Sequence, residues 1–157
     1  MITRFQLNGA LVEAVHEPGE TALDYLRRNG LTSVKFGAED GETGSDTILL
    51  DGRAMNSGLI LMATLGGRSV TTLEGLRDEQ FRSLQAAFVD SGAIQCGYCT
   101  PGMLLAIRGL LNETPDPGEN EIREALSAVY CRCTGYVKPV QAVVSYLAAN
   151  AKEHEND

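Results

Sequence analysis

Four cysteines, arranged as two close pairs, constrain the fold of this sequence most strongly. Cys96 and Cys99 form a C-x₂-C motif, and Cys131 and Cys133 form a C-x-C motif after 31 intervening residues. No apolar stretch typical of a signal peptide is visible at the N-terminus, so we expect a reducing, cytoplasmic compartment. In such a compartment, clustered cysteines are typical of metal or redox sites rather than structural disulfides. The fold must therefore bring two distant segments to one centre.

The cysteine-bearing half of the chain has the periodicity of amphipathic helices. Its apolar residues recur at helical spacing in four stretches, which predicts a small helical bundle. These residues are Phe81, Leu84 and Phe88; Leu104, Ile107 and Leu111; Ile122, Ala125, Leu126 and Val129; and Val140, Val143, Val144 and Leu147. Pro101 is expected at the first position of the second helix. Cys96 and Cys99 would then precede a helix N-terminus, whose N–H groups and dipole stabilise thiolates.

The first half of the chain is expected to be rich in β-strands, with one helix. The dipeptide Asn8-Gly9 predicts a hairpin between two apolar stretches. Thr21 is a candidate cap for a helix that ends before Gly30. Residues 48–50 predict a short buried strand followed by a turn, and residues 70–73 predict the last strand. One helix among four or five strands indicates a compact α+β unit.

Composition and charge narrow the functional classes. The 157 residues are 43% apolar and 22% charged, as in ordinary globular proteins. The net charge is −8 and no basic stripe is present, so a nucleic-acid partner is not expected. No 18-residue apolar run is present, so no membrane span is expected. A change in composition near residues 74–78 predicts two domains, 1–76 and 77–157.

Several kinds of site could use these cysteines. A Cys₄ zinc site usually has cysteines two to four residues apart, so the C-x-C pair is tight for zinc. Four inert buried cysteines would not be expected to occur as two close pairs. A [2Fe–2S] cluster held by four cysteines is the remaining interpretation.

The residues around the cysteines resemble the sequence motifs of one family. Gln95–Gly102 (QCGYCTPG) and Cys131–Tyr136 (CRCTGY) resemble the second cluster motif of the small iron–sulfur subunits of molybdenum hydroxylases. This family includes xanthine dehydrogenase, aldehyde oxidoreductase and carbon monoxide dehydrogenase. Further residues that resemble this family's sequences occur at positions 26–27, 30–32, 34–35, 49–52 and 70–76. The resemblance implies an α+β fold with an N-terminal β-grasp, ferredoxin-like domain followed by a four-helix [2Fe–2S]-binding domain.

The resemblance also implies a function. The chain would carry one [2Fe–2S] cluster on Cys96, Cys99, Cys131 and Cys133 and transfer electrons, with no catalytic residues of its own. Its partners would be a large subunit that binds the molybdopterin cofactor and a further electron-accepting subunit, either a flavin (FAD) subunit or another carrier. Gln95, through its amide, and Cys133, through its sulfur or backbone, would touch the pterin edge. A capping amide is the alternative role for Gln95, and a scaffold subunit with little redox role is the alternative function.

The sequence departs from this family in its first half. Relatives carry a second, plant-type cluster there, in the pattern C-x₄-C-x₂-C followed by a distant fourth cysteine. Ala38, Thr43, Asp46 and Gly58 occupy the corresponding positions here. Iron in such clusters requires thiolate ligands, and only Asp46 could bind a metal at all. We therefore predict that this first cluster is absent while its scaffold persists.

The same loop is acidic. Glu39, Asp40, Glu42 and Asp46 would repel an anionic cluster, in agreement with its loss. A solvated surface loop is the favoured interpretation. A Ca²⁺ site is the alternative, although the ligand order of an EF-hand is missing.

Each remaining polar or aromatic residue that could take part in the site also has a simple structural role. Arg132, between two cysteines, could tune the cluster potential by its charge or form a surface salt bridge. Tyr98 and Tyr136 flank the cysteines and are expected to shield the site from water. His16 is expected at an exposed strand end and His154 in a loose tail, and neither is predicted to be a ligand.

Overall fold

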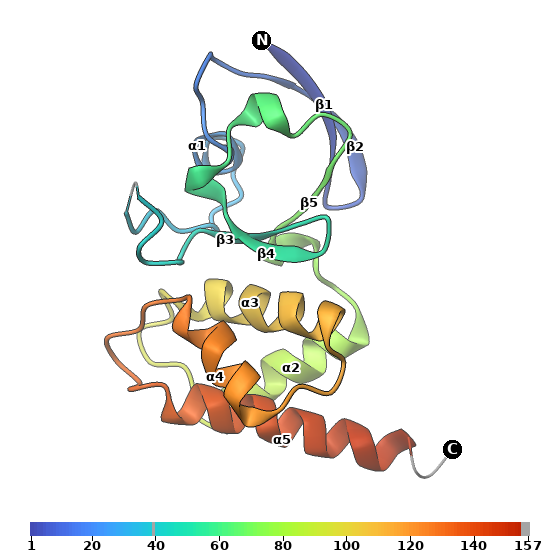
Figure 1. Ribbon diagram of the computed structural model, residues 1–157, viewed down its shortest axis with the longest axis vertical. Coiled ribbons are helices and arrows are strands. Elements are labelled where there is room, and N and C mark those ends of the chain that lie inside the picture. Colours follow the sequence, from blue (N-terminus) through green and yellow to red (C-terminus); the bar gives the residue numbers. More distant parts are fainter. Residues whose placement is uncertain (39, 155–157) are drawn as a thin grey trace.

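The computed structural model describes residues 1–38 and 40–154, which form a five-stranded sheet and five α-helices (Figure 1). In chain order the strands and helices are β1 (Ile2–Leu7), β2 (Ala10–Val15), α1 (Ala22–Arg28), β3 (Thr47–Leu50), β4 (Arg53–Asn56), β5 (Ser69–Thr71), α2 (Glu79–Asp90), α3 (Thr100–Glu113), α4 (Glu119–Ser127) and α5 (Val137–His154). Short 3₁₀ turns occur at Ser57–Leu59, Met62–Thr64 and Leu73–Gly75. The mixed α+β class predicted from the sequence is confirmed.

The sheet has the order β2-β1-β5-β3-β4. β1 pairs antiparallel with β2 and parallel with β5, and β3 pairs antiparallel with both β5 and β4. Asn8 and Gly9 both have positive φ, at 52° and 83°, so the predicted hairpin turn is confirmed. Asp51 and Gly52 turn the chain in the same way between β3 and β4.

Local signals in the sequence also fix α1. The Thr21 hydroxyl accepts the Asp24 N–H at 3.1 Å, as expected of a cap. Asn29 ends the helix, and Gly30 follows with a φ of 84°, the left-handed conformation that glycine tolerates best. β5 is shorter than predicted, since it ends at Thr71 and Leu73 begins a 3₁₀ turn.

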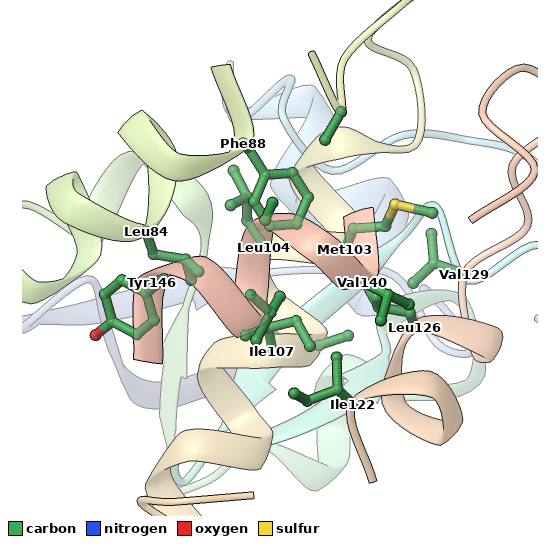
Figure 2. Packing of buried hydrophobic residues seen from close by; sticks show 14 of the residues in the cluster. Leu84, Phe88, Met103, Leu104, Ile107, Ile122, Leu126, Val129, Val140 and Tyr146 are labelled. Atoms are coloured by element: carbon green, nitrogen blue, oxygen red, sulfur yellow. The ribbon is translucent and has the colours of Figure 1, made fainter. Parts of the chain in front are cut away.

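Two separate hydrophobic clusters fill the chain. One lies between the sheet and α1 and includes Phe5, Leu26 and Ile48. The other lies among α2, α3, α4 and α5, and its fully buried members include Phe88, Ile107 and Leu126 (Figure 2). All four predicted helices are confirmed. Each cluster belongs to one half of the chain, so each half buries its own apolar side chains.

The helix boundaries differ from expectation at two places. α3 begins at Thr100, so Pro101 is its second residue rather than its first. α4 ends at Ser127, and Val129 lies beyond the helix although it is fully buried. Val129 is apolar because it is buried, and its spacing from Ile122 and Leu126 happens to match that of a helix. The sequence therefore predicted a helix that extends past the end of α4.

α3 lies between the sheet and the other helices (Figure 1). A Cβ on Gly109 of α3 would lie 2.8 Å from the Ala54 nitrogen of β4, so glycine permits close packing there. Arg53 pairs with Glu113 at 2.7 Å across the same contact. The two halves of the molecule therefore meet along α3, whose N-terminus carries Cys99.

His16 does not lie on the surface as predicted. It is 3% exposed, and its Nε2 lies 2.9 Å from the Thr3 hydroxyl across the first hairpin. The cause is the pairing of the two strands, which places the ring of a strand-end residue over a neighbouring strand. α5 extends through His154. In the part of the chain that the structure describes, no helix has the length and apolarity needed to span a membrane.

Candidate metal centre

The fold brings the two cysteine motifs together. The C-x₂-C motif lies in the loop between α2 and α3, and Cys99 is the residue that caps α3. The C-x-C motif lies in the loop between α4 and α5. The sulfurs of Cys96 and Cys133 are 3.6 Å apart, and both residues are exposed. One cysteine from each loop thus forms an outer sulfur pair.

Cys99 and Cys131 form the second, inner pair. Each is 7% exposed, and each thiol shifts the pKa of the other, since Cys131 raises the pKa of Cys99 and Cys99 lowers that of Cys131. The four sulfurs are therefore arranged as two pairs that each join the two loops. Among the side chains that the structure describes, no three Cys, His, Asp or Glu residues converge as a group that could hold one ion.

Burial opposes the effect that the sequence predicted for Cys99. Burial, followed by the neighbouring Cys131 and Cys96 thiols, raises the pKa of Cys99 to about 12, although it stands at the start of α3. The position before a helix thus does not by itself make Cys99 a thiolate. A coordinated metal cation deprotonates a thiol outright, so a metal would override this preference.

Hydrogen bonds favour the thiolate of Cys131. Burial raises its pKa, but bonds from the Thr134 hydroxyl and from backbone N–H groups outweigh burial, and the net pKa is lowered. The Thr134 oxygen lies 3.1 Å from the Cys131 sulfur. In the outer pair, the Cys96 thiol raises the pKa of Cys133. The inner pair therefore combines one thiol and one sulfur that is well prepared to carry negative charge.

Tyr136 holds the C-x-C loop in place. Its hydroxyl accepts the Cys131 N–H at 2.7 Å and donates to the Val129 carbonyl at 3.1 Å. Its own N–H donates to the Thr134 hydroxyl, and its φ is 66°. The sequence predicted that Tyr136 shields the site, and the structure shows a direct hydrogen-bonding role that residue spacing did not reveal.

Gln95 and Arg132 lie on the exposed side of the centre. The Gln95 amide donates to the Cys133 carbonyl at 3.2 Å, so it joins the two loops instead of capping a helix. The guanidinium of Arg132 lies 5.8 Å from the centre of the Tyr130 ring. The salt bridge considered for Arg132 is not among the ion pairs of the described residues, and a cation–π contact takes its place.

None of the four positions of the plant-type cluster pattern is a cysteine, and three of them form hydrogen bonds. The Asp46 carboxylate accepts the Gly58 N–H at 2.7 Å, joining the third and fourth positions. At the second position, the Thr43 hydroxyl lies 2.9 Å from that of Ser45. At the first position, Ala38 is half-buried.

The expectation of a solvated acidic loop is therefore wrong for Asp46. This residue is 1% exposed, because its side chain turns inward to Gly58, whereas Asp40 and Glu42 are exposed. Glu39 lies outside the described residues. One carboxylate oxygen, Asp46 Oδ1, is buried without a hydrogen-bond partner among the described residues.

Comparisons with known proteins identify this arrangement. Residues 72–144 match the family described as a [2Fe-2S] binding domain. The chain is 44% identical over 142 residues to the nicotinate dehydrogenase small FeS subunit of Eubacterium barkeri, covering 89% of this chain and 90% of the relative. It is 39% identical over 141 residues to the xanthine dehydrogenase iron-sulfur-binding subunit of Escherichia coli O157:H7, covering 88% and 89%. The chain belongs to the family of small iron–sulfur subunits of molybdenum hydroxylases.

Solved structures agree with this membership. The subunit aligns with quinoline 2-oxidoreductase from Pseudomonas putida 86 at a TM-score of 0.88 and 40% identity, over 98% of this chain and 96% of that chain. It aligns equally well, at 34% identity, with aldehyde oxidoreductase from Desulfovibrio desulfuricans ATCC 27774, but covers 17% of that longer chain. The family expected from the residues around the cysteines is confirmed.

The sequence did not predict the contacts that link the two halves of this subunit at the centre. The Tyr98 hydroxyl donates to the Phe36 carbonyl at 2.5 Å, and the Tyr130 N–H donates to the Thr43 carbonyl at 2.8 Å. Both contacts are to backbone carbonyls, which residue identities do not encode. The glycine at position 44 was the one available signal, because close backbone approach often requires glycine.

Proposed function

We propose that Cys96, Cys99, Cys131 and Cys133 hold one [2Fe–2S] cluster and that the subunit transfers electrons for a molybdenum hydroxylase. The pairing of the sulfurs carries this proposal. A two-iron cluster held by four cysteines requires two thiolates for each iron. Cys96 with Cys133, and Cys99 with Cys131, supply two such pairs. When bound, the cluster supplies one-electron redox chemistry.

The protein around the sulfurs has separate tasks. The buried pair, Cys99 and Cys131, keeps water away from one side of the site. Thr134 places a hydroxyl at the Cys131 sulfur, and hydrogen bonds to sulfur are one of the factors that set a cluster's potential. Tyr136 fixes the backbone of the same loop through two hydrogen bonds. These residues would hold the inner half of the site rigid.

We propose a single cluster per subunit. The first-half positions Ala38, Thr43, Asp46 and Gly58 offer no thiolate, and two of them are bonded to each other. The iron content expected is therefore about two atoms per chain rather than about four.

The exposed side of the centre would face a molybdopterin cofactor in a large partner subunit. Gln95, Cys96 and Cys133 are exposed there, and the Gln95 amide lies against the Cys133 carbonyl. Gln95 and Cys133 would touch the pterin edge, while Cys99 and Cys131 remain covered by their own chain. A flavin (FAD) subunit or another electron carrier would be the second partner. The reduced cysteines suit a cytoplasmic location.

The two halves would act as two domains. We propose a β-grasp, ferredoxin-like domain over residues 1–76 and a four-helix [2Fe–2S]-binding domain over residues 77–157. The two separate hydrophobic clusters support this division. Leu73 and Leu76 already pack against the helical cluster, so the segment before α2 would serve as the joint between the domains.

One observation favours a second candidate function. The emptied first-half positions remove the relay through which relatives pass electrons onward. The subunit could therefore act as a scaffold that holds the cofactor edge with little redox turnover. Because the two functions use the same residues, only the redox behaviour of the cluster distinguishes them.

Metal analysis and electron paramagnetic resonance of the complex that co-purifies with this subunit test both functions. We expect about two irons per copy of this chain, molybdenum in the partner and one reducible [2Fe–2S] signal after substrate addition. A cluster that stays oxidised during turnover would favour the scaffold. Zinc without iron would overturn both, and iron with sulfide bound within residues 1–76 would overturn the single-cluster proposal.

A further inference from the structure

We propose that the emptied loop, residues 36–38 and 40–46, now fixes the two cysteine loops relative to each other. Its task would have changed from holding iron to positioning the neighbouring cluster site. This inference rests on the proposed function, because the positioned group is the cluster on Cys96, Cys99, Cys131 and Cys133. It concerns the contacts between the two cysteine loops and the first half of the chain.

The first contact reaches the C-x₂-C loop. Tyr98 stands between Cys96 and Cys99, and its hydroxyl donates to the Phe36 carbonyl at 2.5 Å. The Tyr98 side chain is 47% exposed, so packing alone does not hold the ring. The hydroxyl is the part of Tyr98 that ties this loop to the other half of the chain, 62 residues away.

The second contact reaches the C-x-C loop. The N–H of Tyr130, the residue before Cys131, donates to the Thr43 carbonyl at 2.8 Å. Thr43 occupies the second ligand position of the lost cluster. The emptied loop therefore holds one hydrogen bond to each cysteine loop, and the two bonds leave it from its two ends.

Two glycines bring the backbones close enough for these bonds. A Cβ on Gly44 would lie 1.9 Å from the Ala128 carbonyl oxygen, just before the C-x-C loop. A Cβ on Gly102, in the first turn of α3, would lie 2.7 Å from the Gly44 carbonyl oxygen. The emptied loop is thus wedged between the start of α3 and the end of α4, which are the two supports of the cysteines.

Hydrogen bonds inside the emptied half give the loop a shape without iron. Asp46 accepts the Gly58 N–H, and Ser57 donates its hydroxyl to the Asp46 carbonyl at 2.7 Å. The Asn56 amide donates to the Gly41 carbonyl at 2.6 Å. A loop that is held on one side and bonded to both cysteine loops on the other acts as a rigid brace.

Two variants of the co-purified complex test the brace, each with a matched control. Tyr98→Phe removes the hydroxyl and keeps the ring. Its control is Tyr130→Phe, since the Tyr130 side chain is 54% exposed and its hydroxyl forms no hydrogen bond found among the described residues. Gly44→Ala adds a Cβ against Ala128. Its control is Gly67→Ala, which has a similar positive φ of 74° but no atom within 4 Å of the new Cβ.

Iron release to a chelator and the electron paramagnetic resonance spectrum of the reduced cluster are measured in each complex. We expect Tyr98→Phe to lose iron roughly two- to ten-fold faster, the range that one lost hydrogen bond allows, with shifted g-values. Gly44→Ala should lose iron faster still, while both controls match the unmodified complex.

Two results would overturn the inference alone. One is an unchanged release rate and spectrum in Tyr98→Phe. The other is equal damage from Gly44→Ala and Gly67→Ala, since backbone strain and not the contact would then be the cause. An unmodified complex without any [2Fe–2S] signal would overturn the proposed function together with this inference.

Discussion

The Asp46 carboxylate accepts a hydrogen bond from the Gly58 N–H, with 2.7 Å between Oδ2 and the nitrogen. These two residues occupy the third and fourth positions of the plant-type cluster pattern. A side chain at position 58 would crowd this contact, because a Cβ there would lie 3.1 Å from Asp46 Oδ2. The aspartate and the glycine therefore fit each other. Where the cluster pattern would place two cysteine ligands, this chain has a hydrogen bond.

Removing the Asp46 carboxylate should destabilise the sheet half. Asp46→Ala leaves the half-buried Gly58 N–H without its acceptor, and such a loss costs about 1–3 kcal/mol. Asp46→Asn keeps an acceptor oxygen and should cost less. Urea unfolding of the purified subunit, followed by circular dichroism, measures the free energy. The exposed neighbour Asp40→Ala is the control, and an equal loss in that variant would contradict the assignment.

Restoring the four cysteines should restore the first cluster. The variant carries Ala38→Cys, Thr43→Cys, Asp46→Cys and Gly58→Cys, and iron should rise from about two to about four atoms per chain. The sheet order and loop path are already in place, so only the ligands are missing.

A triple variant that retains Asp46 is the control for this restoration. It keeps a carboxylate, which is a poor ligand for an iron–sulfur cluster, at the third position beside the Gly58→Cys substitution. Its iron content should therefore stay at about two atoms per chain. Iron analysis and the number of resonance signals decide the result. If the quadruple variant folds without additional iron, the emptied loop has lost more than its thiols.

The local features of this fold could be predicted from the sequence. Asn8-Gly9 and the Thr21 cap act through their own backbone neighbours, so residue identity was sufficient to place the first hairpin and α1. The paired cysteines and the residues around them predicted the family and located the candidate metal centre. These signals are short-range or motif-based, and both kinds survive without a three-dimensional structure.

Long-range contacts escaped prediction for a physical reason. His16 is buried because strand pairing sets its ring beside Thr3, 13 residues away. Tyr98 meets a backbone carbonyl 62 residues away, and every residue type offers the same carbonyl. β4 was not assigned because residues 53–55 are all exposed, so their side chains show no alternation. Tertiary placement decided each of these cases.

Tyr136 should control the C-x-C loop through its hydroxyl. Tyr136→Phe leaves the Cys131 N–H and the Val129 carbonyl without their partner, which should cost about 1–3 kcal/mol and loosen the loop. The reduction potential of the proposed cluster should shift, because the backbone beside Cys131, one of its proposed ligands, moves. Potentiometric titration of the complex measures the shift. Tyr25→Phe, a change in the distant sheet half, should leave the potential unaltered.

Acid should weaken the end of the first half, just before α2, through Glu74. Its carboxylate accepts the Ser33 N–H at 3.0 Å and the hydroxyls of Ser33 and Thr72 at 2.6 Å each. Burial raises the pKa of Glu74, but these hydrogen bonds outweigh burial and the net pKa is lowered. The folded chain thus favours the ionised form, and this stability is complete above the ordinary glutamate pKa of 4.5.

That contribution should disappear as the pH falls from 4.5 through the lower pKa of the folded state. Glu74→Gln removes the titration, so its unfolding midpoint in urea should be lower than the unmodified value at neutral pH and should fall less on acidification. Glu42→Gln, which changes an exposed carboxylate, should follow the unmodified subunit at every pH. If the Glu74→Gln and unmodified curves run parallel in acid, another group carries the acid sensitivity.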